Sequence, residues 1–145
     1  MLPRWHILFG AIFTVVLFYF APQTNPIYIV LVFLSSFLID FDHYIASLIK
    51  TKNPSLTHSL EYHRIKLIQE KKEIARGVRK KSDFHLFHTV EFHILVGLLS
   101  MFWAGFFYIF IGMIFHSLLD VFSLFSGGAF HRREFFFFNW ARKRF

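Results

Sequence analysis

Four long apolar runs alternate with polar stretches along the chain. The runs cover residues about 5–21, 27–45, 84–103 and 106–124. Each is close to the roughly 20 apolar residues that an α-helix needs to cross the hydrocarbon core of a bilayer. The first run lacks a small-residue cleavage site and further runs follow it, so we interpret it as a retained helix and not a signal peptide. The pattern predicts an all-α membrane protein with four transmembrane helices, forming a single domain over residues 1–145.

The polar stretches predict additional helices outside the hydrocarbon. Residues 50–81 are strongly basic, and the middle of this segment, from about Ser55 to Lys80, predicts a helix that Ser55 or Thr57 could cap. We expect a tight turn at Ala104-Gly105, between the third and fourth runs. The tail, residues 130–145, mixes basic and aromatic side chains, which is typical of a segment anchored at the membrane interface.

The composition and the placement of charge support a membrane protein. The sequence is 55% hydrophobic, contains 23 phenylalanines and has a formal net charge of +7. All 16 Lys and Arg residues lie near the N-terminus, in the 50–81 segment or in the tail. By the positive-inside rule, both termini and the basic segment are expected in the cytoplasm, with the protein integral to a plasma or inner membrane. This placement argues against a specific nucleic-acid partner.

Histidines and carboxylates gather at the predicted cytoplasmic ends of all four runs. With four Asp and Glu side chains at one depth, repulsion and desolvation would be severe unless cations neutralised them. The chain has no cysteine, so a metal would be held by His and carboxylate. We predict a divalent metal, zinc in the first place with manganese or iron as alternatives, in one to three ions. The predicted ligands are His6, Asp40, Asp42, His43, His88, Glu91, His116 and Asp120.

The start of the third run offers two rival ligands. His88 and Glu91 are three residues apart and would share a helix face, but His93 is a second imidazole in the same stretch. Whether Glu91 or His93 binds the metal stays open at this point, and His85 and His63 are further candidates. We assign Asp42, Glu91 and Asp120 as the candidate catalytic carboxylates. His58 and His131 lie in basic surroundings and are interpreted as surface residues.

The order of these motifs resembles that of the predicted membrane-bound metal-dependent hydrolases, which include the LexA-binding, inner-membrane-associated hydrolase group and its archaeal-type relatives. The shared features are an early His, an Asp-x-Asp-His closing the second span, a His motif opening the third and a His-x-x-x-Asp in the last. In this chain they are His6, Asp40 to His43, His88 to Glu91, and His116 to Asp120. The chain departs from many members in having Ile39 before the second motif and Glu91 within the third.

The ligand order is also similar to that of zinc-dependent phospholipase C and related single-strand nucleases. That resemblance implies a helical protein that clusters several zinc ions and cleaves phosphoester bonds. A site at the lipid–water boundary would favour a lipid or another amphiphilic phosphoester as the substrate.

Two other functions fit parts of the pattern. A non-catalytic scaffold that binds anionic lipid would explain the basic residues but not the carboxylates. A metal or proton transporter would need polar groups through the full membrane thickness, whereas this chain has them mainly near one side. In either case, or for an anionic substrate, the predicted contacts are Lys71, Lys72, Lys80, Lys81, Arg132 and Arg133.

Overall fold

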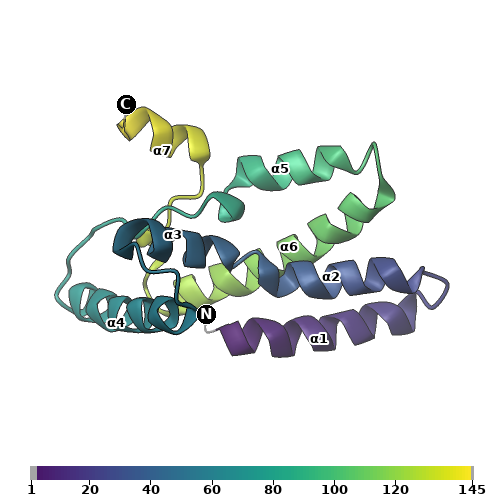
Figure 1. Ribbon diagram of the computed structural model, residues 1–145, viewed down its shortest axis with the longest axis horizontal. Helices are drawn as coiled ribbons and strands as arrows, with labels where there is room; N and C mark the ends of the chain where they lie inside the picture. The colour runs from purple at the N-terminus through teal and green to yellow at the C-terminus, as the bar shows by residue number, and fades with distance from the viewer. Residues whose placement is uncertain (1–2, 145) are drawn as a thin grey trace.

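The computed structural model describes residues 3–144, and within that range the protein is entirely helical, with no strand. The described residues form seven α-helices and two short 3₁₀ segments, joined by turns, and Figure 1 shows their arrangement. Their bounds are α1 Pro3–Phe20, α2 Pro26–Leu38, α3 Phe41–Thr51, α4 Leu56–Ala75, η1 Leu86–His88, α5 Val90–Leu99, α6 Ala104–Ser126, η2 Phe130–Arg132 and α7 Phe137–Arg144.

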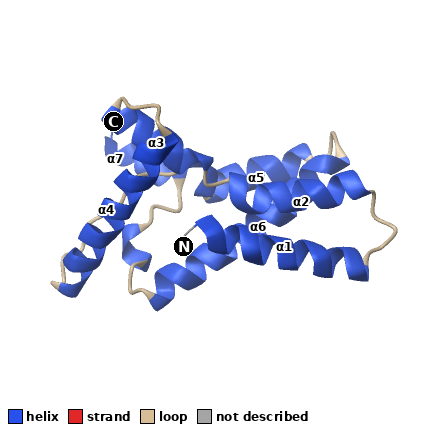
Figure 2. Ribbon diagram, turned by 60° about the horizontal axis from the view of Figure 1, so that its bottom comes forward, coloured by secondary structure: helices blue, strands red, loops and turns tan. Residues whose placement is uncertain are grey.

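The helices form an elongated bundle with a polar cap at one end. Helices α1, α2, α5 and α6 run alongside one another, while α3, α4 and α7 lie at the opposite end from the α1–α2 turn (Figures 1 and 2). Helix α2 makes its most extensive contacts with α6 and also packs on α1, and α5 packs on α6. The four apolar runs of the sequence therefore come together as one bundle.

Two segments are long and apolar enough to cross a membrane. They are Pro26–Thr51, in which α2 and α3 follow each other almost without interruption, and Ala104–Ser126. Helix α1 is shorter, and α5 has only 10 residues, about 15 Å at 1.5 Å per residue. Of the four predicted spans, two therefore correspond to helical segments that are long and apolar enough to cross a membrane.

Several predicted boundaries differ from the observed ones. The run over 27–45 is not one regular helix. At Asp40 the backbone N–H donates to the carbonyl of Phe37, three residues back, instead of the residue four back as in an α-helix. The expected turn at Ala104-Gly105 was wrong, since the turn occupies residues 100–103 and α6 begins at Ala104. The basic segment does form a helix, α4, and Ser55 caps it by accepting a hydrogen bond from the His58 N–H at 3.4 Å.

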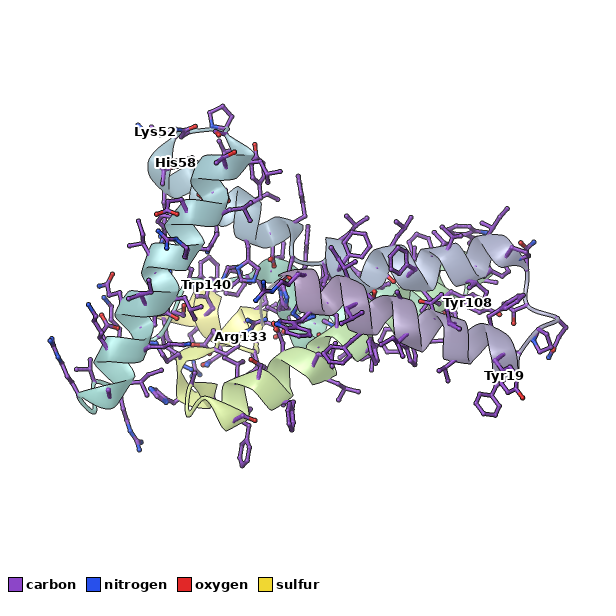
Figure 3. All side chains as sticks on the ribbon, turned by 90° about the horizontal axis from the view of Figure 1, so that it is seen from below. Tyr19, Lys52, His58, Tyr108, Arg133 and Trp140 are labelled. Atoms are coloured by element: carbon purple, nitrogen blue, oxygen red, sulfur yellow. The ribbon has the colours of Figure 1, made fainter. Side chains whose placement is uncertain are left out.

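Burial in this bundle is inverted relative to a typical soluble domain. Among the described residues, the fully enclosed side chains are mostly polar, including His6 and His116 at 0% exposure, whereas Phe102 is 86% exposed and Tyr19 78%. Figure 3 shows apolar side chains such as Tyr19 projecting outward from the bundle. An exposed apolar surface around a polar interior suits a lipid environment and would aggregate in water.

Small residues let the helices approach closely. A Cβ added at Gly112 of α6 would lie 2.4 Å from the Val32 carbonyl oxygen of α2, and one at Gly10 of α1 would lie 2.1 Å from Ser36 Oγ. Such contacts between small residues are typical of helices packed in membranes. Ser35 and Ser36 hydrogen-bond to carbonyls of their own helix. Their hydroxyls are therefore occupied within α2 and do not form the row of polar groups through the bundle that a transporter would need.

Candidate metal centre

The polar interior is a cluster of histidines and aspartates at the junction between the bundle and its cap. Helix α1 supplies His6, the α2–α3 junction supplies Asp40 and Asp42, η1 supplies His88, and α6 supplies His116 and Asp120. The break between α2 and α3 matters here because Asp40 lies at the N-terminus of α3 and Asp42 in its first turn. All six side chains have low exposure, with Asp40 the highest at 17%.

Four donor atoms converge at the centre of the cluster. Asp40, His88, His116 and Asp120 each offer one ligand atom, and these atoms lie within 4.8 Å of one another. The Nε2 atoms of His88 and His116 are 3.1 Å apart. Asp40 Oδ1 lies 3.4 Å from each of these nitrogens, and Asp120 Oδ2 lies 3.8 Å from each.

The tautomers of the two imidazoles follow from their other ring nitrogens. His116 Nδ1 lies 2.9 Å from the Ser36 carbonyl oxygen, which can only accept, so the proton is on Nδ1. His88 Nδ1 lies 3.0 Å from Asp42 Oδ2 and donates to that carboxylate in the same way. In the neutral imidazoles both Nε2 atoms then carry lone pairs, and these face each other beside two carboxylate oxygens. Such a set of converging acceptors could hold a cation between them.

The charge and the spacing of the donors both fit a divalent metal. Asp40, Asp42, Asp120 and the nearby Arg133 have a formal charge of −2 among them, which one divalent ion balances. Four donors held about 2.0–2.1 Å from zinc in a tetrahedron lie about 3.3–3.4 Å from one another. The five separations given above, from 3.1 to 3.8 Å, bracket that value. The carboxylate behind His88 and the carbonyl behind His116 are the outer partners that metal-binding histidines use.

A second group of donors adjoins the first. Asp42, His43 and His88 also offer ligand atoms within 4.8 Å of one another. Nearby, Asp42 Oδ1 and His85 Nδ1 are 3.5 Å apart, and both are buried without a hydrogen-bond partner. The ring of His85 lies against that of His43, with centroids 3.8 Å apart. These atoms could hold a further cation or a proton.

His6 reaches the cluster from its opposite side. Its ring stacks on that of His116 with the centroids 3.9 Å apart, and its Nε2 lies 3.2 Å from Asp120 Oδ1. It therefore approaches the carboxylate oxygen of Asp120 that the four-donor group does not use. His6 thus lies beside two residues that are more than 100 positions away in the sequence, and its role as a ligand stays a prediction.

Glu91 does not join the cluster. Its carboxylate accepts hydrogen bonds from the backbone N–H groups of Phe137 and Phe138, at 2.8 and 3.2 Å, where α7 begins. The negative charge suits this position, since the first N–H groups of a helix have no partner within it. Of the two rival ligands, Glu91 therefore does not lie beside the four donor atoms. His93 is also occupied, with Nδ1 on the Thr89 carbonyl and Nε2 on Ser117 Oγ.

The other predicted residues lie around the centre and not in it. His63 bonds to the carbonyl oxygen of His43 at 2.8 Å, and its burial lowers its pKa. Arg132 pairs with Glu73, while Lys71, Lys72, Lys80 and Lys81 remain exposed. Arg133 is different, because its guanidinium donates to Asp120 Oδ2 at 2.9 Å. Figure 3 shows Arg133 where the bundle meets the cap.

Sequence reasoning missed two features of this site. One is the Ser36 carbonyl oxygen, a backbone group with no signature in the sequence. The other is the direct contact of Arg133 with the cluster, since the sequence predicted Arg132 and Arg133 alike only as contacts for an anionic lipid or substrate. A scan against protein-family models, a search of curated proteins and a search of solved structures found no match for this chain. The geometry of the site therefore carries the functional argument.

Proposed function

We propose that the protein is a membrane-bound metal-dependent hydrolase that cleaves a phosphoester of a lipid or another amphiphile at the cytoplasmic face. The observation that carries this proposal is the pair of imidazole Nε2 atoms, 3.1 Å apart, that face each other beside two aspartate oxygens. The motif order that resembles the predicted membrane-bound metal-dependent hydrolases supports the same conclusion.

The residues of the cluster have separate roles in this proposal. Asp40, His88, His116 and Asp120 hold the metal, for which zinc suits the imidazole and carboxylate donors best. Asp42 fixes His88 in the tautomer that leaves Nε2 free of a proton. A divalent ion bound there would lower the pKa of water and polarise a phosphoryl oxygen.

Arg133 favours a phosphoester as the substrate. Its side chain is 11% exposed, and its guanidinium reaches the carboxylate of Asp120 beside the donor atoms. A guanidinium matches the geometry of phosphate oxygens and forms strong charge-assisted hydrogen bonds with them. In this position Arg133 would orient an anionic group of the substrate over the metal donors.

The membrane part of the proposal is a four-span topology with both termini in the cytoplasm. Two segments have the length for it, and the exposed apolar surface extends over α1 and α5 as well. The basic helix α4 would then attract anionic headgroups, at about 1 kcal/mol per basic residue near the surface. Reporter fusions after Gln23 and Trp103 should report the outside, and fusions after Lys72 the cytoplasm. A cytoplasmic signal after Gln23 would contradict this topology.

The decisive experiment measures metal content and hydrolysis together. We expect the purified protein to contain stoichiometric zinc, manganese or iron, and to hydrolyse bis(p-nitrophenyl) phosphate until a chelator is added. His88→Gln and His116→Gln should lose both the metal and the activity. His58→Gln, on the exposed face of α4, is the matched control and should retain both.

Two results would overturn the proposal. Protein without a stoichiometric transition metal would end the metal-centre assignment and leave the scaffold function. Stoichiometric metal without hydrolysis of any phosphoester, but with metal movement into vesicles, would end the hydrolase assignment in favour of transport.

A further inference from the structure

A groove between α5 and α6 opens directly onto the metal donors. Its volume is about 420 Å³, within the range of pockets that hold small molecules. His88, Asp120 and Arg133 form its polar end, and its walls are otherwise almost entirely apolar, with Ile94, Leu98 and Ile114 among them. His88 and Asp120 are also members of the four-donor cluster. The groove and the centre are therefore one continuous site.

We propose that this groove binds the hydrocarbon chain of the substrate while Arg133 binds its anionic phosphoryl head. The occupant is an amphiphile with one such head and one chain seated between α5 and α6. The inference rests on the proposed function for the reaction, and it adds where the two parts of the substrate lie. The contrast between one charged end and long apolar walls selects this class over a polar phosphoester such as a sugar phosphate or a nucleotide.

Gly97 keeps the groove open. It lies two residues before the end of α5 and lines the groove, and a Cβ built on it would meet the ring of Phe110 at 3.6 Å, an ordinary van der Waals contact. A methyl group therefore fits, but a longer side chain would extend into the space of the chain. Glycine in a helix interior is unfavourable by itself. Glycine at position 97 is explained if the substrate's hydrocarbon chain occupies the groove, because a larger side chain there would fill that space.

The same position gives a variant that fills the groove without harming the fold. Gly97→Leu places a strong helix former in α5, so any loss of binding is separable from unfolding. Leu95→Phe is the matched control, since Leu95 is 51% exposed on the same helix and does not line the groove. Arg133→Gln removes the charge at the polar end, and Arg133→Lys retains it.

The test measures binding of alkylphosphonates with four to ten carbons to the metal-loaded protein in lipid nanodiscs. These probes have the anionic head and the chain but no ester bond, so binding is measured apart from hydrolysis. The wild-type affinity should rise with chain length, by up to about fourfold per buried methylene. Partition of the probe into lipid is the same for every variant, so ratios between variants report on the groove.

Each variant has its own expected pattern. Gly97→Leu should bind butylphosphonate as the wild type does but lose most of the gain from the longer chain, while Leu95→Phe keeps it. Arg133→Gln should lower the affinity for all chain lengths by a similar factor, at least tenfold, and Arg133→Lys by less.

Some outcomes would contradict only the proposal that the groove binds the hydrocarbon chain, and others only the proposed hydrolysis. A chain-length gain that Gly97→Leu retains, or no gain in the wild type, would overturn the groove while leaving metal binding and hydrolysis intact. Correct chain-length behaviour with no hydrolysis of any ester would support the groove and overturn the proposed reaction. Weaker binding of every probe by Gly97→Leu would show a general disturbance of the site and would also overturn the groove.

Discussion

Two groups of basic side chains surround the aspartates at the polar end of the molecule, one of lysines and one of histidines. Asp83 lies between the ammonium groups of Lys50 and Lys66, with a hydrogen bond from Tyr62 at 3.2 Å. Asp40 and Asp42, by contrast, face imidazoles. Lysine carries its own positive charge, whereas a histidine that donates through one nitrogen offers a lone pair on the other.

The difference indicates which group is structural and which is a site. A carboxylate between two lysines is already balanced and joins the α3, α4 and 80–83 segments. Asp40 instead lies beside the Nε2 atoms of His88 and His116, so its charge is one that a bound cation could balance, and burial makes an unbalanced charge costly. The same residue type therefore has a different role because of the side chains that surround it.

The largest expected effect comes from exchanging one carboxylate in each group for its amide. Asp40→Asn should lower the metal affinity at least 100-fold, because it removes a charged donor from the four-donor set. Asp83→Asn should leave the metal content unchanged. Elemental analysis of both variants checks this, and equal metal content would erase the distinction between the two groups.

Asp42→Asn should have a smaller effect on the same measurement. The amide can keep the shape of the side chain but no longer favours the Nδ1–H tautomer of His88 as strongly. Loss of such an outer partner costs about 10–100-fold in metal affinity or activity. A loss as large as that of Asp40→Asn would instead make Asp42 a direct ligand of the second donor group.

The stability contribution of Asp83 should depend on pH. Burial raises the pKa of Asp83, but its hydrogen bonds to Lys50 and Lys66 and their charges outweigh this and hold it well below its usual range. A depressed pKa stabilises the folded state above the ordinary value of 3.8 and this contribution is lost as the pH falls through the folded-state pKa. The melting temperature of wild type should exceed that of Asp83→Asn at pH 7, and the gap should narrow below about pH 4. A gap that is independent of pH would contradict the charged pairing.

The smallest effect is expected at Glu91. Glu91→Gln weakens two hydrogen bonds to backbone N–H groups at the start of α7 and should lower the free energy of unfolding by about 1 kcal/mol. Its metal content should equal that of wild type. Glu61→Gln, in an exposed pair with Arg64, is the control and should change stability less. Loss of metal in Glu91→Gln would return this residue to the centre.

Much of the fold and of the site followed from the sequence for simple reasons. An apolar run must be buried or face lipid, so residues 106–124 could be recognised as a helix. Helix α6, Ala104–Ser126, includes all of them. A spacing of four residues fixes one helix face, so His116 and Asp120 had to point the same way. Because the chain has no cysteine, any metal had to be held by histidine and carboxylate side chains.

Only the tertiary structure decided which side chains meet. Glu91 and His88 are three residues apart, yet η1 ends at His88 and α5 begins at Val90, so they do not share one helix face. The break at Asp40 directs two carboxylates inward, and the return of the tail brings Arg133 to Asp120. Periodicity describes directions within one regular helix, whereas a helix end or a returning chain sets directions through contacts between segments distant in sequence.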